Sequence, residues 1–241
     1  MVEMTWQTIE RIIFNLRDLN YRGRISWFWI NEPLMDRRIF DILKLSKKHC
    51  PRAFHTLTTN GDLLNQAKYL ELRESGMDAM AISIYDDKTY AKVKPWEDSR
   101  LVLHDKRDPK HLENRAGSIK QHGEMFEQEE RRHINRSCER PFKMITVNPK
   151  GEISLCCSDM YTDVLMGNVN EQRLEEIWYN EKFEHYRRTL NEKGRKGLML
   201  CDGCSYRGKA NGPFAPLHAR PKADYFQYVV HTVRHALRFD E

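Results

Sequence analysis

The sequence has no hydrophobic run long enough to cross a membrane, which takes roughly 18 consecutive apolar residues. Charged residues make up 31% of the 241 residues, and the mean hydropathy is −0.75. Residues 1–4 also lack the basic and apolar regions of a secretory signal. We therefore expect a cytoplasmic protein with no membrane partner, whose six cysteines stay reduced.

The sequence has no large excess of charge of one sign, because 40 basic residues stand against 35 acidic ones and give a net charge of +5. The basic residues are spread along the chain, and most of them have acidic neighbours. Domains that bind nucleic acid concentrate Lys and Arg on one face or stripe. The charge pattern therefore predicts no nucleic-acid partner.

Two kinds of functional motif are also missing. The ten histidines show no H-E-x-x-H spacing, and no Ser/His/Asp arrangement can be traced. Zinc modules usually carry two C-x-x-C pairs, whereas this sequence has one, from Cys201 to Cys204. These patterns assign no catalytic residue, and they do not favour zinc.

Hydrophobic periodicity in the first half alternates between helical and strand patterns. The helical spacing marks segments at 5–20, 36–48 and from 63 to a stop at Gly76. The third helix rests on an apolar stripe made by Leu63, Leu64, Ala67 and Leu70. Short apolar runs mark strands at 25–30, which should be buried on both faces, and at 54–59, 79–85 and 101–104. The alternation predicts an α/β fold with a parallel sheet.

The pattern changes in the second half. Residues 105–137 are polar, and a second unit begins at Cys138. Two short strands, at 142–147 and 152–157, flank an Asn-Pro-Lys-Gly turn and should form a hairpin. Helices are expected at 174–178 and 183–190, and a last one at 225–239.

Five of the six cysteines lie in the last 104 residues. Thiolates suit zinc or an iron–sulfur cluster. Cys201 and Cys204 can face one site, because Gly203 permits a tight turn between them. The hairpin should bring Cys138 close to Cys156. These thiols are the candidate metal ligands, and the alternative is that they are buried structural thiols.

The adjacent residues Cys156 and Cys157 require a choice, since neighbours on a strand point to opposite faces. Cys157 shares a face with Ile153 and Leu155, whose side chains should be buried. Cys156 shares the face of Ser154. We therefore expect Cys156 to be the ligand and Cys157 to pack in the core.

Several segments of the second half resemble, in order, the SPASM (twitch-type) module of radical S-adenosylmethionine (SAM) enzymes. They are CERPF at 138–142, PKGEISLCCSD at 149–159, GNV at 167–169, EIW at 176–178 and CDGC at 201–204. The resemblance implies that four thiols bind an auxiliary 4Fe–4S cluster, those of Cys138, Cys156, Cys201 and Cys204. No cysteine follows Cys204, which implies a single cluster, the layout of radical SAM alcohol oxidases.

The first half resembles the (β/α) barrel of the same enzymes. WINEPLMD at 29–36 is similar to their G-E-P-L segment, where backbone groups and an acid hold the amino group of SAM. TTNG at 58–61 and the strand AISIY at 81–85 match the segments that follow. The resemblance implies that SAM is contacted by Asn31, which replaces the usual glycine, by Glu32 and by Ser83. Taken alone, an acid directly before a proline is typical of a helix start.

One departure from the family bears on activity. Radical SAM enzymes hold the SAM-cleaving cluster on a C-x3-C-x2-C loop after the first barrel strand, and the 241 residues contain no such motif. The sequence begins at what resembles the helix after that loop. We therefore expect a fragment, a gene start placed too late, or a degenerate protein. The chain as printed should not start SAM-dependent radical chemistry.

The resemblance as a whole implies three regions. They are an incomplete parallel (β/α) barrel at 1–130, a SPASM domain with a β-hairpin and helices at 131–210, and a helical extension at 211–241. The implied chemistry is SAM-dependent radical oxidation or modification of a small molecule or peptide, with an electron-donor protein as partner. The alternative is a non-catalytic binding module or partner subunit stabilised by zinc or an iron–sulfur cluster.

Overall fold

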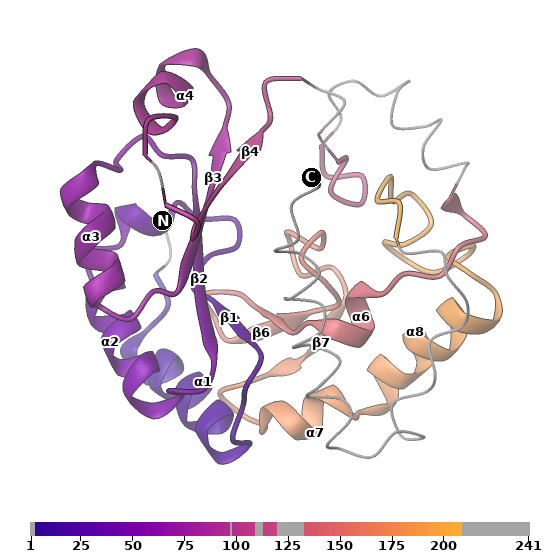
Figure 1. Cartoon of the computed structure of the whole chain (residues 1–241). Coiled ribbons are helices and arrows are strands. Elements are labelled where there is room, and N and C mark those ends of the chain that lie inside the picture. The colour runs from indigo at the N-terminus through magenta and orange to yellow at the C-terminus, as the bar shows by residue number, and fades with distance from the viewer. Residues whose placement is uncertain (1–2, 97, 109–112, 120–132, 209–241) are drawn as a thin grey trace. The chain divides into compact units, whose positions relative to one another are not determined.

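The computed structural model describes residues 3–96, 98–108, 113–119 and 133–208 (Figure 1). These residues fall into two compact units. One contains residues 16–108 and is called here the four-stranded unit; the other contains residues 3–15, 113–119 and 133–208 and is called the three-stranded unit. The helix expected at 225–239 and the extension expected at 211–241 lie outside the described residues.

The four-stranded unit is built on a parallel sheet with strand order β1-β2-β3-β4. Its strands are β1 (Arg24–Ser26), β2 (Phe54–Thr59), β3 (Ala79–Ile84) and β4 (Leu101–Asp105). Between them come η1 (Pro33–Met35), α2 (Ile39–His49), α3 (Gln66–Glu74) and α4 (Asp87–Val93). Parallel neighbours need crossover segments, which these helices provide. The predicted α/β fold with a parallel sheet is confirmed.

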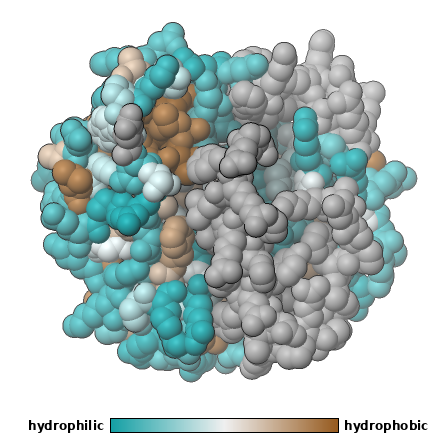
Figure 2. Space-filling view, viewed as in Figure 1, coloured by the Kyte–Doolittle hydropathy of each residue, from teal (hydrophilic) through white to brown (hydrophobic). Residues whose placement is uncertain are grey.

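The core of this unit lies between the sheet and its helices, and Figure 1 shows α2 and α3 on the same face of the sheet. Leu57 of β2 and Ile82 of β3 are fully buried, as are Leu43 of α2 and Leu72 of α3. On the outside, hydrophilic side chains cover most of the coloured surface in Figure 2, with only a few separate apolar patches. No helix of the described chain is both long and apolar enough to span a membrane.

The strand expected at 25–30 is shorter than predicted. β1 ends at Ser26, and the last backbone contact to β2 runs from Trp27 N to Thr56 O at 3.4 Å. Beyond it the chain bends toward η1, and Ile30 is 50% exposed. The expectation of a strand buried on both faces is wrong, because apolar composition does not show where pairing ends.

The third helix is also displaced from its prediction. Asn65 caps α3, since its Oδ1 accepts a hydrogen bond from Lys68 N at 2.8 Å. The helix therefore starts at Gln66 and buries Tyr69 and Leu72. Leu63 and Leu70 are 43% and 54% exposed and Ala67 is exposed as well, so of the predicted apolar stripe only Leu64 lies in the core. The predicted stop is confirmed, because Gly76 has a φ of +107° directly after the helix.

The three-stranded unit carries an antiparallel sheet with strand order β5-β6-β7. Its elements after residue 133 are α6 (Arg140–Lys143), β5 (Thr146–Val147), β6 (Glu152–Ser154), β7 (Leu165–Asn168), α7 (Leu174–Trp178) and α8 (Glu181–Glu192). The predicted hairpin is confirmed, but Phe142 lies in α6 and β6 stops at Ser154. The helix expected at 5–20 is α1 (Trp6–Asp18), whose residues divide between the two units.

Candidate metal centre

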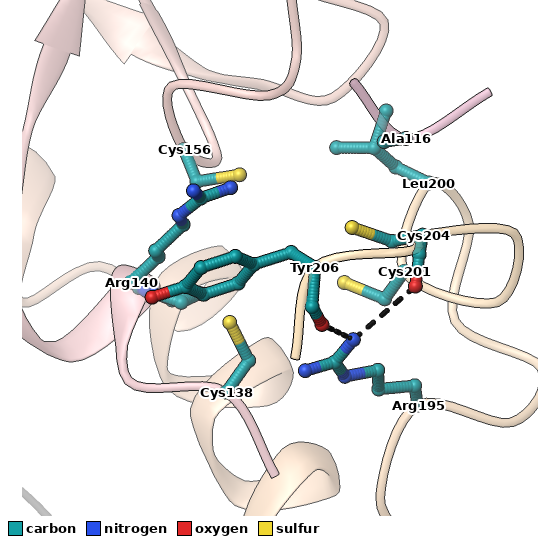
Figure 3. Close-up of a pocket in the computed structure, with 10 residues that line it drawn as sticks. Ala116, Cys138, Arg140, Cys156, Arg195, Leu200, Cys201, Cys204 and Tyr206 are labelled. Atoms are coloured by element: carbon teal, nitrogen blue, oxygen red, sulfur yellow. Dashed lines mark hydrogen bonds between the residues drawn. The ribbon is translucent and has the colours of Figure 1, made fainter. Parts of the chain in front are cut away.

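Four thiols line one pocket of the three-stranded unit (Figure 3). They come from three separate segments: the residues before α6, the residues after β6, and the loop after α8. The structure thus brings together the four cysteines predicted as metal ligands, Cys138, Cys156, Cys201 and Cys204. In Figure 3 their sulfur atoms point toward a common space. All six cysteines of the chain are free thiols.

Cys138 lies before the hairpin and Cys156 shortly after its second strand, so the turn of the hairpin helps to set where both residues lie. Asn148 Oδ1 accepts hydrogen bonds from Lys150 N at 2.9 Å and from Glu152 N at 3.1 Å. Gly151 has a φ of +81°, and a side chain there would meet Asn170. A residue without Cβ is therefore required at this point of the turn. Both thiols end up buried, each on a residue 8% exposed.

The reason given by the sequence for choosing Cys156 over Cys157 does not hold. Strand alternation ends with β6 at Ser154, and the next residues form bends and turns. Consequently Ser154, Leu155 and Cys156 are buried in succession, whereas Cys157 is only half-buried. Cys157 is not among the pocket-lining residues, and it does not share the burial of Leu155.

The loop from Cys201 to Cys204 is a run of tight backbone turns. Cys201 N donates to Leu198 O at 3.0 Å, and Cys204 N donates to Cys201 O at 3.3 Å. Leu200 takes up the left-handed conformation, with a φ of +71°, and Gly203 does not. The expectation that Gly203 makes this turn possible is therefore wrong: nothing lies within 4 Å of a Cβ built there.

Burial makes these thiols hard to ionise. It raises the pKa of Cys138 to about 11, and it raises the pKa of Cys156, Cys201 and Cys204 above the ordinary thiol value. The neighbouring thiols Cys138 and Cys204 raise the pKa of Cys201 further. Metal binding requires thiolates, so these thiols would have to lose their protons when a metal or cluster binds.

Two arginine side chains already bring positive charge to the pocket wall, those of Arg140 and Arg195 (Figure 3). Arg195 is 1% exposed and donates from Nη1 to the carbonyl oxygens of Cys204 and Tyr206. Arg140 donates to Ser158 Oγ, and its guanidinium lies 3.4 Å from the centroid of the Tyr206 ring. The charge of Arg195 lowers the pKa of Cys138, against the larger effect of burial.

The sequence analysis did not predict either arginine at the pocket. Only Arg140 lies in a sequence motif that could have indicated it. Arg140 lies two residues after Cys138, inside the segment that carries the resemblance. Arg195 belongs to no motif and is one of 40 basic residues. A buried arginine is rare unless it is paired, but burial is not visible in the sequence.

No three His, Cys, Asp or Glu side chains in the described part of the chain converge as one metal ion would require. Thiolates that share a zinc ion lie about 3.8 Å apart, given a Zn–S distance of about 2.3 Å. A cluster places iron and sulfide between its thiolates and so separates them further. The pocket therefore offers four thiols around a space rather than around a point.

The predicted SAM residues lie in the four-stranded unit, where Glu32 is held by three donors. Its Oε1 accepts from Thr59 Oγ1 at 2.7 Å and from Leu34 N at 3.1 Å. Its Oε2 accepts from Asn60 N at 2.8 Å. Glu32 caps η1 with Pro33 in the first turn, so the structure shows the helix-start role as well. The carboxylate joins the turn after β1 to the end of β2.

Asn31 and Ser83 lie near the same edge of the sheet. Asn31 is exposed, and its Oδ1 accepts from Trp29 N at 3.0 Å. Ser83 is half-buried, one residue before the end of β3, and pairs in register with His104 of β4. The C-terminal edge of parallel strands is where ligands bind in such α/β folds.

Comparison with known proteins shows which proteins this chain is similar to. Residues 138–205 match the SPASM family model, described as an iron–sulfur cluster-binding domain. With its parallel α/β unit as well, the chain is similar to radical SAM/SPASM proteins. The match contains all four cysteines of the pocket.

A particular relative is the S-adenosyl-L-methionine-dependent 2-deoxy-scyllo-inosamine dehydrogenase of Niallia circulans. It is 27% identical to this chain in an alignment of 217 residues, which covers 84% of this chain and 81% of the relative. The crystal structure of BtrN in complex with AdoMet and 2-DOIA is similar with a TM-score of 0.74 and 26% identity, over 85% of this chain and 81% of BtrN. BtrN in an open conformation shows the same fold, with a TM-score of 0.66, 23% identity and coverage of 91% and 86%.

Proposed function

We propose that Cys138, Cys156, Cys201 and Cys204 bind one auxiliary 4Fe–4S cluster. The observation that carries this proposal is the meeting of four buried or half-buried thiols, from three separate segments, around one pocket. Four cysteine thiolates are the usual ligands of such a cluster. The match of residues 138–205 to an iron–sulfur domain supports the assignment.

The match to an iron–sulfur cluster-binding domain supports a cluster in preference to zinc. A single zinc ion would need its ligands to converge on one point, and no such group occurs among the described side chains. A cluster needs four thiols spaced around a larger volume. Zinc at the pocket is therefore the outcome that would contradict the proposal.

The charges around the pocket fit a cluster held by four thiolates, which carries a net negative charge. Arg140 and Arg195 stand at the wall and offset that charge. Within the described structure, Arg195 Nε is buried and has no hydrogen-bond partner.

The proposed role is that of an iron–sulfur protein in SAM-dependent oxidation of a small molecule, the class of reaction named by the dehydrogenase relative, with SAM cleavage expected only where a C-x3-C-x2-C loop is present. When bound, the cluster supplies one-electron chemistry and SAM supplies radical chemistry. Four thiolates occupy every iron, so this site serves electron transfer and not SAM cleavage. An electron-donor protein belongs to the proposal as a partner.

For SAM itself we keep the proposed contacts from Asn31, Glu32 and Ser83. A carboxylate has about four acceptor positions, and the protein already uses three of those on Glu32. One position on Oε2 remains for a ligand ammonium group. The hydrogen bonds from Thr59 and Asn60 hold the carboxylate in place for that contact.

SAM cleavage requires a cluster with an iron left open, held by three thiolates. The printed 241 residues contain no C-x3-C-x2-C motif to supply them. We therefore expect this chain to form no 5′-deoxyadenosine from SAM and a strong reductant, as measured by chromatography of the anaerobic reaction. A form that carries such a loop is expected to produce it. Repeated turnover by the printed chain would contradict this.

The metal assignment is tested by anaerobic reconstitution with iron and sulfide, followed by iron, sulfide and zinc analysis. We expect about four iron atoms per chain and a brown protein with broad visible absorption. Stoichiometric zinc without iron, in a colourless protein, would overturn the cluster assignment.

A further inference from the structure

A short segment outside the matched iron–sulfur domain contacts every part of the chain that carries a pocket thiol. This segment, residues 113–116, is called here the strap; the domain match begins at residue 138. The strap and all three cysteine-bearing segments belong to the three-stranded unit. Its contacts therefore lie within one compact body.

Asn114 bonds to the Cys201–Cys204 loop and the residue after it through both its backbone and its side chain. Its backbone N donates to Ser205 Oγ at 2.9 Å, and its Oδ1 accepts from Ser205 N at 3.0 Å. Its Nδ2 donates to Gly203 O at 2.7 Å. Asn114 is 2% exposed, and its two bonds with Ser205 are buried, whereas its bond to Gly203 O is partly buried. The loop cannot shift without breaking several buried hydrogen bonds at once.

The residues on either side of Asn114 contact the other two segments. Arg140, which lies two residues after Cys138, donates from Nη2 to both carboxylate oxygens of Glu113, at 3.0 and 3.1 Å. Arg115 Nη1 donates to Cys157 O at 3.4 Å, on the segment that carries Cys156. Three consecutive residues thus contact the three cysteine-bearing segments, one each.

The strap also forms part of the pocket wall. Ala116 lines the pocket beside the thiols and is labelled in Figure 3. Arg115 and Ala116 are both left-handed, with φ values of +49° and +52°. Two consecutive non-glycine residues in this region are unusual and persist only where surrounding contacts hold them. The buried bonds of Asn114 are such contacts.

We propose that Asn114 is a positioning residue for the cluster, which ties the Cys201–Cys204 loop to the strap and thereby slows the loss of bound iron. This inference rests on the proposed function, since it presupposes a cluster in the pocket. It adds that a residue some 90 positions from that loop in the sequence, and outside the iron–sulfur domain match, governs how long the cluster stays bound.

The test compares wild type with Asn114→Ala after anaerobic reconstitution. An iron chelator is added, and the decay of the visible absorption is followed. We expect Asn114→Ala to lose its cluster about tenfold faster, because the loop then carries unsatisfied buried groups and opens more often. Asn114→Asp keeps the acceptor for Ser205 N and loses the donor to Gly203 O, so it should show an intermediate rate.

A matched control is Asn180→Ala. Asn180 also makes side-chain hydrogen bonds in the three-stranded unit, accepting from Phe183 N at 2.9 Å and donating to Met166 O at 2.7 Å. Neither bond reaches a cysteine-bearing segment, so this variant should lose stability without faster iron release. Thermal unfolding of both variants shows whether they are comparably destabilised.

The outcomes separate the two proposals. If wild type takes up no iron, the proposed function fails, whatever the variants do. If wild type holds the cluster and Asn114→Ala releases it no faster than Asn180→Ala, the strap proposal alone is overturned. Should Asn114→Ala not fold, Ser205→Ala removes the acceptor for Asn114 N only, and it must speed release about threefold for the proposal to stand.

Discussion

The thiol pocket and the C-terminal edge of the parallel sheet, where Glu32 lies, differ in how their polar groups are satisfied. In the pocket, burial raises the pKa of Cys156 and Cys201, and Arg195 keeps an unpaired buried nitrogen within the described structure. At the sheet edge, Glu32 already accepts three hydrogen bonds from the protein itself. The protein itself therefore satisfies the carboxylate at the sheet edge more fully than it satisfies Arg195 at the pocket.

This difference predicts whether the residues of each site matter with or without a bound ligand. A pocket thiol should matter mainly once metal is present, because the free thiol is neutral and buried. Glu32 should matter even without SAM, because its carboxylate joins two turns of the folded chain. The following predictions test this contrast, beginning with the largest expected effect.

Replacing Cys201 by Ser should remove most of the iron taken up on reconstitution, and the same holds for Cys138, Cys156 and Cys204. A serine hydroxyl is a poor ligand where a thiolate is required. Cys157→Ser is the control and should keep its iron, because Cys157 does not line the pocket. Iron analysis decides, and loss in Cys157→Ser with retention in Cys156→Ser would reverse the ligand assignment.

Replacing Arg195 by Gln should lower the midpoint potential of the cluster by roughly 50 mV, because a nearby cation favours the reduced, more negative state. Arg195 is buried at the pocket, so its charge is weakly screened. Anaerobic potentiometric titration measures the shift. Arg187→Gln is a matched control, since Arg187 is equally buried but bonds to Pro141 O and Trp178 O and is not a pocket-lining residue. An equal shift in both variants would count against a local charge effect.

Replacing Glu32 by Ala should lower the free energy of unfolding by about 2 kcal/mol without any ligand, because Thr59 Oγ1 and Asn60 N lose their acceptor. Asn31→Ala should cost less than about 0.5 kcal/mol, since Asn31 is exposed. Urea unfolding of the metal-free protein measures both. If the two variants were equally stable, Glu32 would be a ligand-binding residue only, and the contrast between the sites would fail.

The smallest effect is a pH dependence in the four-stranded unit. Burial opposes the charge of Asp78, but hydrogen bonds from His55 and Lys47 outweigh it and lower its pKa to about 2. A lowered folded-state pKa gives stability that is present above the ordinary value of 3.8 and is lost as the pH falls toward 2. Because solvent screens this partly exposed carboxylate, the contribution is about 1 kcal/mol. Asp78→Asn should therefore unfold with less dependence on pH between 4 and 2, as followed by circular dichroism.

The sequence predicted the pocket better than it predicted the choice of ligand. The order of cysteines around a turn and a C-x-x-C pair was enough to expect four thiols together, and the structure brings them together. The choice between Cys156 and Cys157 relied on strand alternation, which ends at Ser154. Likewise, the apolar run at 25–30 predicted a strand, but hydrophobicity does not show that pairing stops after Trp27.

Contacts distant along the chain were not predictable from local pattern. Asn114 and Ser205 are 91 residues apart and belong to no common motif. Arg195 becomes part of the pocket only because α8 and the loop after it return to the segment before Cys138. The side chain of Asn65 set the start of α3 and with it the buried face, although the leucines at 63 and 70 suggested another.

The sequence by itself determined the alternating α/β pattern, the hairpin and the four thiols with their spacing, because periodicity, turn chemistry and cysteine positions are local properties. Only the tertiary structure decided which thiol of the adjacent pair faces the pocket and which arginines lie beside it. It also decided that Glu32 accepts hydrogen bonds from other residues of the chain. These depend on burial and on hydrogen bonds between distant segments. Their energies arise only when water is excluded, and that happens only when the chain is folded.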